Sequence, residues 1–264
     1  IDSVQIKPIS PVTKDFRYTI SKDPQKDTLN FWYAPPQTDS LVFTVAKAQA
    51  IDTFKLRLKK MKPDSLQIAN IYSGELPMGK KFGWKSNIPL AKVDSTKIKV
   101  FGKDSLTIPF STQLNKEKLE YTLLFKTKYN ESYRIEALPE AMTDFFGNTN
   151  DTLNVQLKTK KLEEYSILKL AINKELQFPI VIQLTDEKGK TVEKELYFET
   201  TQKQYLFEDI NPGKYNIRVI EDRNKNKIWD TGDFQKRIQP EKIIYYPKTI
   251  ELRANWEVEE VWNE

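Results

Sequence analysis

The sequence predicts an all-β chain made of tandem antiparallel β-sandwiches. Apolar and polar residues alternate with a period of two along most of its 264 residues. Gly, Pro, Asn and Asp fall between the alternating segments, where turns are expected. Apolar spacing typical of a helix is hard to find over ten or more residues. Many short strands separated by turn signals are typical of sandwiches rather than of mixed α/β folds.

Each predicted strand is a short run in which every second residue is apolar. Two segments, 139–146 and 255–264, are short helix candidates. The second of these also fits a strand, which would place Trp256, Val258 and Trp262 on one face. The predicted strands cover residues 28–34, 40–46, 54–60, 97–102, 106–111, 119–126, 132–138, 152–160, 167–173, 179–186, 194–200 and 214–222.

Turn density divides the chain into three predicted domains. The segments 70–94 and 158–168 are rich in turn residues and separate the strand sets. The division gives a small β domain over 1–78, a second domain over 79–162 and a third over 163–264. The first is small for a complete sandwich, so we expect it to be completed by residues upstream of Ile1. The opening sequence IDSVQIKPISPV has no initiator Met and no signal-peptide pattern, which also indicates an interior start.

The composition excludes several classes of function. The chain has no Cys and no His, which removes thiol catalysis, disulfides, Cys/His zinc sites and triads that need imidazole. The net charge of +5 comes from interspersed charges of both signs, so we expect no nucleic-acid partner. No apolar run reaches 18 residues, so we expect no membrane span.

A short motif, Asp-Ser/Thr-Leu/Val, recurs ahead of the predicted strands. An Asp side chain that closes an Asx-turn before a strand explains the motif without modification. The motif also resembles the O-glycosylation acceptor pattern of exported Bacteroidetes proteins. On that interpretation, the candidate acceptors are Ser3, Thr28, Ser40, Ser65, Ser105 and Thr152.

The middle of the chain runs from SNIPLAKVDSTKIKVF to ALPEAMTDFFGNTNDTLNVQLKT. This segment resembles the bacterial Ig-like domains found in tandem in surface proteins and Bacteroidetes lipoproteins. Their pattern has a Pro near the start, a Tyr-x-Ile strand, and Asp-x-x-Gly-Asn before the last strand. Here these are Pro89, Tyr133-Arg134-Ile135, and Asp144 with Gly147 and Asn148. Gly147 can adopt positive φ, and the Asp and Asn side chains can bond a tight connection, so a turn is favoured over a metal or catalytic site.

The last third contains FEDINPGKYNIR, which resembles the prealbumin-like or Cna B-type sandwich. Together with QPEKIIYYP and RANWEVEEVW, it resembles Bacteroidetes exported Ig-like-domain proteins, usually lipoproteins. The resemblance implies an extracytoplasmic protein, associated with the outer membrane or the cell surface. It also implies membrane contact only through an upstream lipid anchor that is not in this chain. It assigns no activity.

One segment, DRNKNKIWDTGD at 222–233, carries oxygen-bearing side chains in the spacing of an EF-hand loop. Calcium prefers six to eight oxygen ligands, taken in such loops from positions 1, 3, 5, 7, 9 and 12. Similar loops occur between strands in Cna B-type repeats. The predicted ligands are Asp222, Asn224, Asn226, the backbone carbonyl of Ile228, Asp230 and Asp233.

Two departures from the EF-hand pattern leave an alternative open. Lys227 stands where Gly is expected, and Asp233 replaces the usual bidentate Glu. The alternative is a polar hairpin whose Asx side chains bond their own backbone. Trp229 is expected to pack beneath the loop.

Three hypotheses for function follow. The first is a non-catalytic extracytoplasmic spacer, adhesion or envelope-assembly module, whose last domain is stiffened by calcium and whose partner is an envelope protein or a glycan. The second is carbohydrate binding through exposed aromatics in 30–36, 82–84 and 255–262. The third is a hydrolase that uses two carboxylates, for which Glu163, Glu164 and the acids of 257–260 are candidates.

Overall fold

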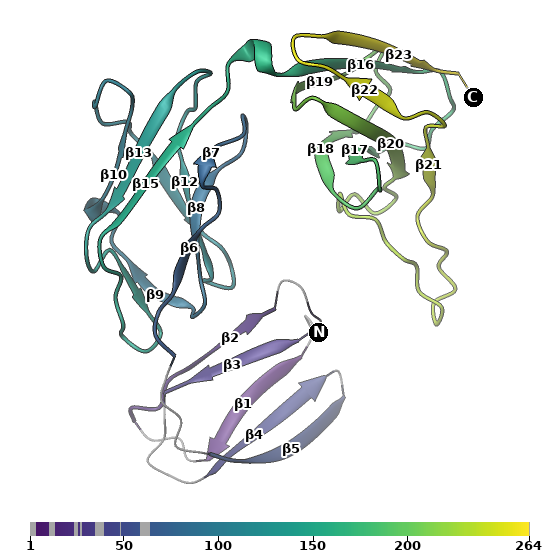
Figure 1. The fold of residues 1–264 in the computed structure, drawn as a ribbon. Helices are drawn as coiled ribbons and strands as arrows, with labels where there is room; N and C mark the ends of the chain where they lie inside the picture. The colour runs from purple at the N-terminus through teal and green to yellow at the C-terminus, as the bar shows by residue number, and fades with distance from the viewer. Residues whose placement is uncertain are drawn as a thin grey trace. The chain divides into compact units, whose positions relative to one another are not determined.

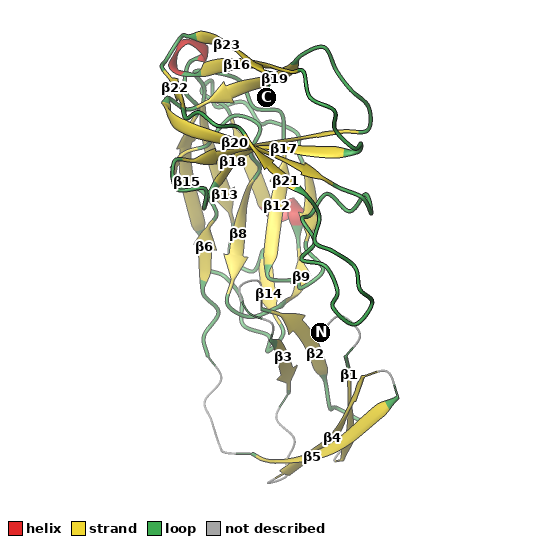
Figure 2. Cartoon of the chain, turned by 90° about the vertical axis from the view of Figure 1, so that its right-hand side faces the viewer, coloured by secondary structure: helices red, strands yellow, loops and turns green. Residues whose placement is uncertain are grey.

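The computed structural model describes residues 4–10, 14–23, 26, 28–34, 40–47, 49–58 and 64–263. In that part of the chain nearly every regular element is a strand, and the helical elements are two short 3₁₀ turns, Ser95–Lys97 and Leu162–Glu164 (Figure 2). The chain forms two compact units, Ile1–Thr159 and Lys160–Glu264. The structure therefore confirms the all-β, multi-sheet fold class that the period-two pattern predicted.

The N-terminal strands of the first unit form a small sheet and a two-stranded ribbon. The sheet has the order β1 (Gln5–Ser10), β4 (Ser40–Lys47) and β5 (Ala50–Arg57), and the ribbon pairs β2 (Tyr18–Lys22) with β3 (Leu29–Tyr33). Their aromatic rings stack in a row: Tyr18 lies on Phe31, Phe31 on Phe43, and Phe43 on Phe54.

The rest of the first unit is a two-sheet sandwich with a further strand pair (Figure 1). One sheet has the order β10 (Ile98–Phe101), β13 (Ser132–Ala137), β15 (Leu153–Lys158) and β7 (Gly74–Glu75). The other has the order β11 (Ser111–Leu114), β12 (Glu120–Leu124), β8 (Phe82–Ser86) and β6 (Ile68–Asn70). The extra pair is β9 (Leu90–Val93) with β14 (Met142–Asp144).

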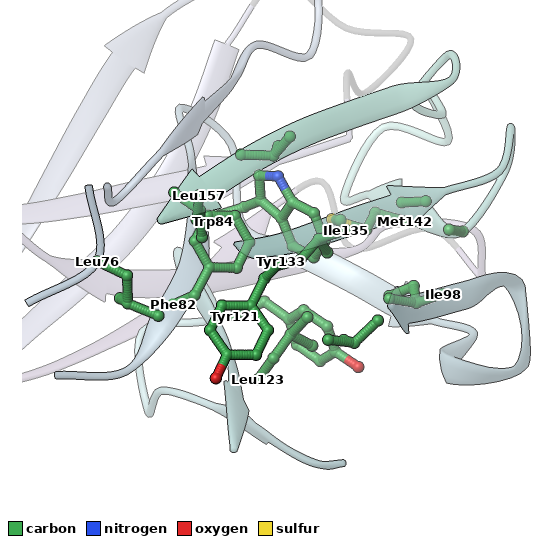
Figure 3. Packing of buried hydrophobic residues seen from close by; sticks show 14 of the residues in the cluster. Leu76, Phe82, Trp84, Ile98, Tyr121, Leu123, Tyr133, Ile135, Met142 and Leu157 are labelled. Atoms are coloured by element: carbon green, nitrogen blue, oxygen red, sulfur yellow. The ribbon is translucent and has the colours of Figure 1, made fainter. Parts of the chain in front are cut away.

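The core of this sandwich is built from the inward-facing residues of both sheets (Figure 3). Trp84 of β8 and Tyr121 of β12 stand opposite each other in register, and the Phe82 ring meets the Trp84 ring edge-on at 5.1 Å. Tyr133 and Ile135 of β13 alternate inward with the same period of two. The aromatics at 82–84 are therefore core residues, and they are unavailable as a sugar-binding surface.

The Asp-x-x-Gly-Asn segment forms the tight connection that the sequence indicated. Asp144 is buried and accepts hydrogen bonds from the backbone N–H groups of Phe146 and Asn148 and from the side-chain amide of Asn148. Gly147 has a φ of 93°, a conformation that favours glycine. The Asp144 carboxylate thus has three hydrogen-bond donors within the same connection, which is the arrangement of a structural turn.

The second unit consists of two sheets. One has the order β19 (Tyr205–Ile210), β16 (Ser166–Ile172) and β23 (Glu257–Trp262). The other has the order β18 (Val192–Phe198), β17 (Ile180–Asp186), β20 (Gly213–Glu221) and β21 (Ile243–Tyr245), and β22 (Ile250–Leu252) also pairs with β20. Their apolar faces enclose a core that includes Phe207, Ile217 and Trp262.

Local predictions at three places can be compared with the structure. The helix candidate at 139–146 contains strand β14, which is held by pairing with β9 rather than by helical periodicity. At 255–264 the strand alternative is confirmed over the helix, since the segment contains strand β23. The predicted strand at 106–111 is instead a connection, and β11 begins at Ser111.

The domain limits also differ from the predicted ones. Strands β6 and β7 precede residue 79, yet they pair with β8 and β15 of the middle sandwich. The structural units meet at Thr159 and Lys160. The division of the chain into three domains stays a prediction.

Two buried tyrosines make the second unit sensitive to alkaline pH. Burial, followed by the charge of Glu193, raises the pKa of Tyr215 to about 12. Burial, followed by the hydrogen bond that the Tyr246 hydroxyl donates to Glu260 at 2.6 Å, raises the pKa of Tyr246 to about 12. Both hydroxyls therefore keep their protons in the folded unit at a pH where the unfolded chain, with a pKa of 10.0, has lost them.

Below pH 10 both tyrosines are protonated in the folded and the unfolded chain, so we expect their contribution to the stability of the second unit to be fully present there. As pH rises from 10 toward 12 the unfolded chain ionises first, and the stability should fall. Urea-unfolding midpoints measured across this range test the prediction. Tyr246→Phe should be less stable at neutral pH but should lose less stability on alkalinisation. A variant with the same alkaline slope as the original chain would contradict the assignment.

Candidate functional site

The long segment between β20 and β21 contains the predicted ion loop. In Figure 1 it extends away from the strands of its own unit. Its base is fixed by main-chain bonds: Glu221 N–H donates to the Lys242 carbonyl at 3.0 Å, and Asp222 N–H donates to the Pro179 carbonyl at 2.9 Å. The loop therefore begins at a rigid point, where β20 lies beside β17.

Three of the six predicted ligands contact one another through their side chains, and a fourth, Asp222, bonds the backbone of the same loop. The side-chain amides of Asn224 and Asn226 both donate to the same oxygen of Asp230, Oδ2, at 2.6 and 2.8 Å. Asp222 is fully buried, and its two carboxylate oxygens accept the backbone N–H groups of Asn226 and Lys227. Positions 3, 5 and 9 of the predicted loop thus meet at one oxygen of Asp230, while position 1 bonds the loop's own backbone, as in the polar-hairpin alternative.

The other two predicted ligands are placed differently. The carboxylate of Asp233 accepts the backbone N–H of Lys236 at 3.0 Å and lies 3.3 Å from the Lys236 ammonium. These contacts with Lys236 hold the pKa of Asp233 below its ordinary value. The Ile228 N–H donates to the side chain of Asn226, while the Ile228 side chain is largely exposed.

Lys227 adopts the conformation that the loop requires despite not being glycine. Its φ is 65°, and its ammonium lies 4.7 Å from the centre of the Tyr197 ring. This cation–π contact offsets part of the roughly 1–2 kcal/mol that a side chain pays in the left-handed region. Gly232, with a φ of 84°, cannot be replaced, because a Cβ there would lie 2.6 Å from the Ile238 carbonyl oxygen.

Glu241 is a residue of this site that the sequence pattern did not indicate. Only 5% of it is exposed, and its carboxylate accepts the backbone N–H groups of Arg223 at 2.8 Å and Asp230 at 3.2 Å. Its backbone carbonyl accepts the Trp229 indole N–H at 2.9 Å. Glu241 therefore braces the loop from outside the 222–233 motif. Trp229 is 40% exposed, so it is held by its indole hydrogen bond rather than packed beneath the loop as expected. The only sequence signal was a lone Glu after Pro240.

The donor set suits a hard cation. The Asp230 carboxylate and two amides meet, and an Asn amide offers its carbonyl oxygen to a cation when it rotates about its last side-chain bond. Here that rotation would break the bonds that the Asn224 and Asn226 oxygens accept from the Asn226 and Ile228 N–H groups. In the described part of the chain, no three His, Cys, Asp or Glu side chains gather as a metal-binding group. The amides of Asn224 and Asn226 would therefore be essential ligands, and calcium coordination stays a prediction.

We expect Glu241→Gln to loosen the loop. The new NH₂ group would face a backbone N–H that needs an acceptor, which costs about 1–3 kcal/mol when the groups are buried. Amide hydrogen exchange should accelerate at Arg223 and Asp230 but not along β17. Glu251→Gln, an exposed position in the same unit, is the control. Unchanged exchange at both amides would show that Glu241 does not brace the loop.

The predicted glycosylation acceptors lie mostly at exposed turns. Ser65, Ser105, Thr152 and Thr28 are exposed, whereas Ser40 is half-buried at the start of β4. Ser3 lies outside the described residues. Asp104 accepts the backbone N–H of Leu106 at 3.0 Å, so at that motif the Asx-turn interpretation accounts for the Asp. Modification at any of these sites stays a prediction.

The acidic candidates for hydrolysis all have structural partners. Glu164 accepts the Lys161 N–H, and Glu163 lies 3.5 Å from the Lys161 ammonium. Across the β16–β23 pair, Lys169 binds Glu257 and lies 3.6 Å from Glu259. Glu260 accepts the Tyr246 hydroxyl. Each of these carboxylates therefore has a structural contact that explains its position without a catalytic role.

The other aromatic residues proposed for sugar binding are mostly buried or in contact with neighbouring side chains. Trp262 is buried, and the Trp32 indole N–H donates to the Ser21 hydroxyl at 2.8 Å. Trp256 is 52% exposed, with the guanidinium of Arg253 5.0 Å from its ring centre. Carbohydrate binding stays a prediction that rests on few exposed rings.

Both sandwiches place an early strand beside their last strand in parallel. In the first unit β7 pairs with β15 (Leu157 with Gly74, Lys158 with Glu75), and Leu76 N–H donates to the Lys158 carbonyl at 2.9 Å. In the second unit β16 pairs with β23 from Ile167–Glu257 to Ile172–Trp262. The other strand pairs of these two sandwiches are antiparallel.

Comparison with known proteins gives no family for the chain. No family model matches it, and no curated protein matches it. Among solved structures, it is similar to a fragment of native alpha-2-macroglobulin from Escherichia coli, with 11% identity, a TM-score of 0.34, and 69% of this chain and 71% of that one covered. It is also similar to a variant of BcpA, the major pilin subunit of Bacillus cereus, with 11% identity, a TM-score of 0.24, and coverage of 92% and 88%. Likeness at this level carries no argument about function.

No helix in the described residues is long and apolar enough to cross a membrane.

Proposed function

We propose that the chain is a non-catalytic extracytoplasmic spacer that resists tension, acting in adhesion or envelope assembly with an envelope protein or glycan as partner. The observation that carries this proposal is the parallel pairing of β16 with β23. Extracytoplasmic location is supported by the absence of Cys and by a predicted ion loop of the weak kind that works in calcium-rich surroundings.

Parallel pairing of an early and a last strand decides how a sandwich responds to force. Tension that enters before β16 and leaves after β23 pulls the two strands in opposite directions along their axes. The hydrogen bonds between them are then loaded together rather than one after another. Two of these bonds, from Ile167 to the Trp256 carbonyl and from Asn173 to the Trp262 carbonyl, lie at opposite ends of the pair.

Side-chain contacts reinforce the same pair. The Ser166 hydroxyl donates to the Arg253 carbonyl at 2.7 Å, and Lys169 binds the carboxylate of Glu257. Trp262, at the end of β23, is almost fully buried in the core. Sliding β23 past β16 would therefore expose a large apolar side chain as well as break the ladder.

In this proposal calcium stiffens the opposite sheet. Asp222, Asn224, Asn226 and Asp230 would hold the ion, which would supply a positive charge among carboxylates that otherwise bond only amides. Because Asp222 and Glu221 are tied to β17 and to Lys242, a fixed loop would also fix the connection from β20 to β21.

Single-molecule pulling of the whole chain tests the proposal. The second unit should unfold at a several-fold higher force when it is loaded along the β16–β23 pair than when the same strands are peeled apart. Calcium should raise the unfolding force of that unit further. Equal forces in the two directions would remove the reason to assign a mechanical role.

A further inference from the structure

The most exposed aromatic side chain of the described residues lies at the tip of the loop between β20 and β21. Phe234 is 97% exposed, so it contributes almost nothing to the packing of its own unit. Ile238, which flanks the same tip, is 52% exposed. Phe234 and Ile238 together leave apolar surface uncovered at one tip, next to charged side chains, which is the kind of surface through which proteins bind.

The tip is an ordered hairpin rather than a loose loop. Asp233 and Ile238 exchange two backbone hydrogen bonds of 2.9 Å, and Arg237 N–H donates to the Phe234 carbonyl at 3.3 Å. Arg237 has a φ of 54°, at a position where turns of this kind favour glycine. The turn therefore presents an arginine at a cost in stability, directly beside the exposed Phe.

The tip is also cationic. It carries Lys236 and Arg237, and Lys225 of the same loop is exposed. Lys236 is partly neutralised, because its ammonium lies 3.3 Å from Asp233. In the described part of the chain, no carboxylate lies within ion-pair distance of Arg237. An apolar ring next to an unneutralised guanidinium fits a surface that is apolar below and anionic above.

From this geometry we propose that residues 234–237 dock on an anionic lipid surface. Phe234 enters the boundary between headgroups and acyl chains, while Arg237 and Lys236 contact lipid phosphates. A stable protein interface usually buries about 800 Å² on each partner, which a four-residue tip does not supply. Docking on a lipid surface, in contrast, requires only that the tip insert between the lipids. The contact does not require calcium in the neighbouring loop, and it would add to any lipid anchor.

The test is co-sedimentation of the whole chain with vesicles, in the presence of chelator. The chain should bind vesicles of phosphatidylcholine mixed with phosphatidylglycerol and should bind pure phosphatidylcholine weakly. The double variant Phe234→Ala with Arg237→Gly should lower the partition coefficient by about tenfold or more. The same variant should melt at the same temperature or higher, because glycine suits the positive φ of position 237.

The matched control is Trp256→Ala with Arg253→Ala, which removes another exposed aromatic and its neighbouring arginine from the same unit. This control should bind anionic vesicles as the original chain does. Equal loss in both double variants would show only general charge attraction and would overturn the proposal. Failure to bind vesicles, with a concentration-dependent dimer that Phe234→Ala abolishes, would assign the tip to a second copy of the chain instead.

Discussion

Asp222→Ala should lower the stability of the second unit and abolish its response to calcium. The carboxylate is fully buried and accepts the backbone N–H groups of Asn226 and Lys227. Its removal leaves the Lys227 N–H without its acceptor and the Asn226 N–H with only the Asn224 side chain, at a cost of about 1–3 kcal/mol even in chelator. The melting temperature of the unit should fall accordingly in calorimetry of the whole chain.

Calcium should raise the melting temperature of the original chain through mass action. With a dissociation constant of about 10⁻⁴ to 10⁻³ M, about 10 mM calcium would stabilise the folded unit by roughly 1.4–2.7 kcal/mol. For a unit of this size, each kcal/mol shifts the melting temperature by roughly 4–8 °C. The expected rise is therefore large enough to measure directly.

A second variant separates ion binding from loop folding. Asp230→Asn keeps the shape of the side chain that Asn224 and Asn226 contact, so it should melt near the original temperature in chelator but should not respond to calcium. Asp186→Asn is the control, since Asp186 bonds Lys190 and Thr191 in another turn of the same unit. A calcium response that survives both loop substitutions would place the ion elsewhere.

The fold was predictable wherever strands were long enough to show alternation. The inward residues Tyr133 and Ile135 of β13, and Ile217 and Val219 of β20, follow the period of two that the sequence displays. Strands such as β7 have only two residues and carry no period. Strand β14 was mistaken for part of a helix because its conformation depends on pairing with β9, a contact that local sequence does not encode.

The candidate site was predictable only in its contiguous part. The alternating oxygens led to Asn224, Asn226 and Asp230, whose side chains contact one another, and to Asp222, whose carboxylate bonds the loop backbone; their role as ligands stays a prediction. Two features could not be read from the motif. Glu241 reaches the loop from the far side of the hairpin, which is a tertiary contact, and Asp233 is engaged locally by Lys236, three residues beyond it and outside the motif. The shared parallel pairing of β7 with β15 and β16 with β23 is likewise a property of the assembled sheets.

The mechanical proposal predicts a large anisotropy in unfolding force. The chain has no Cys, so two introduced cysteines define the pulling points uniquely. Handles at Glu164→Cys and Asn263→Cys load the β16–β23 pair along its length. Handles at Glu164→Cys and Trp256→Cys pull from neighbouring ends of the two strands and open the pair one bond at a time. Both versions leave the registered residues of β16 and β23 unchanged, and Trp256→Cys keeps the backbone carbonyl that accepts the Ile167 N–H.

The most direct test of the tension-resisting role is the unfolding force of the second unit in these two geometries, recorded with calcium and with chelator. We expect a several-fold higher force for the Glu164–Asn263 geometry, because all the bonds between β16 and β23 must break together. Calcium should raise this force further, and Asp230→Asn should remove that rise. Similar forces in both geometries would contradict the claim that parallel strand pairing makes this unit a tension-resisting spacer.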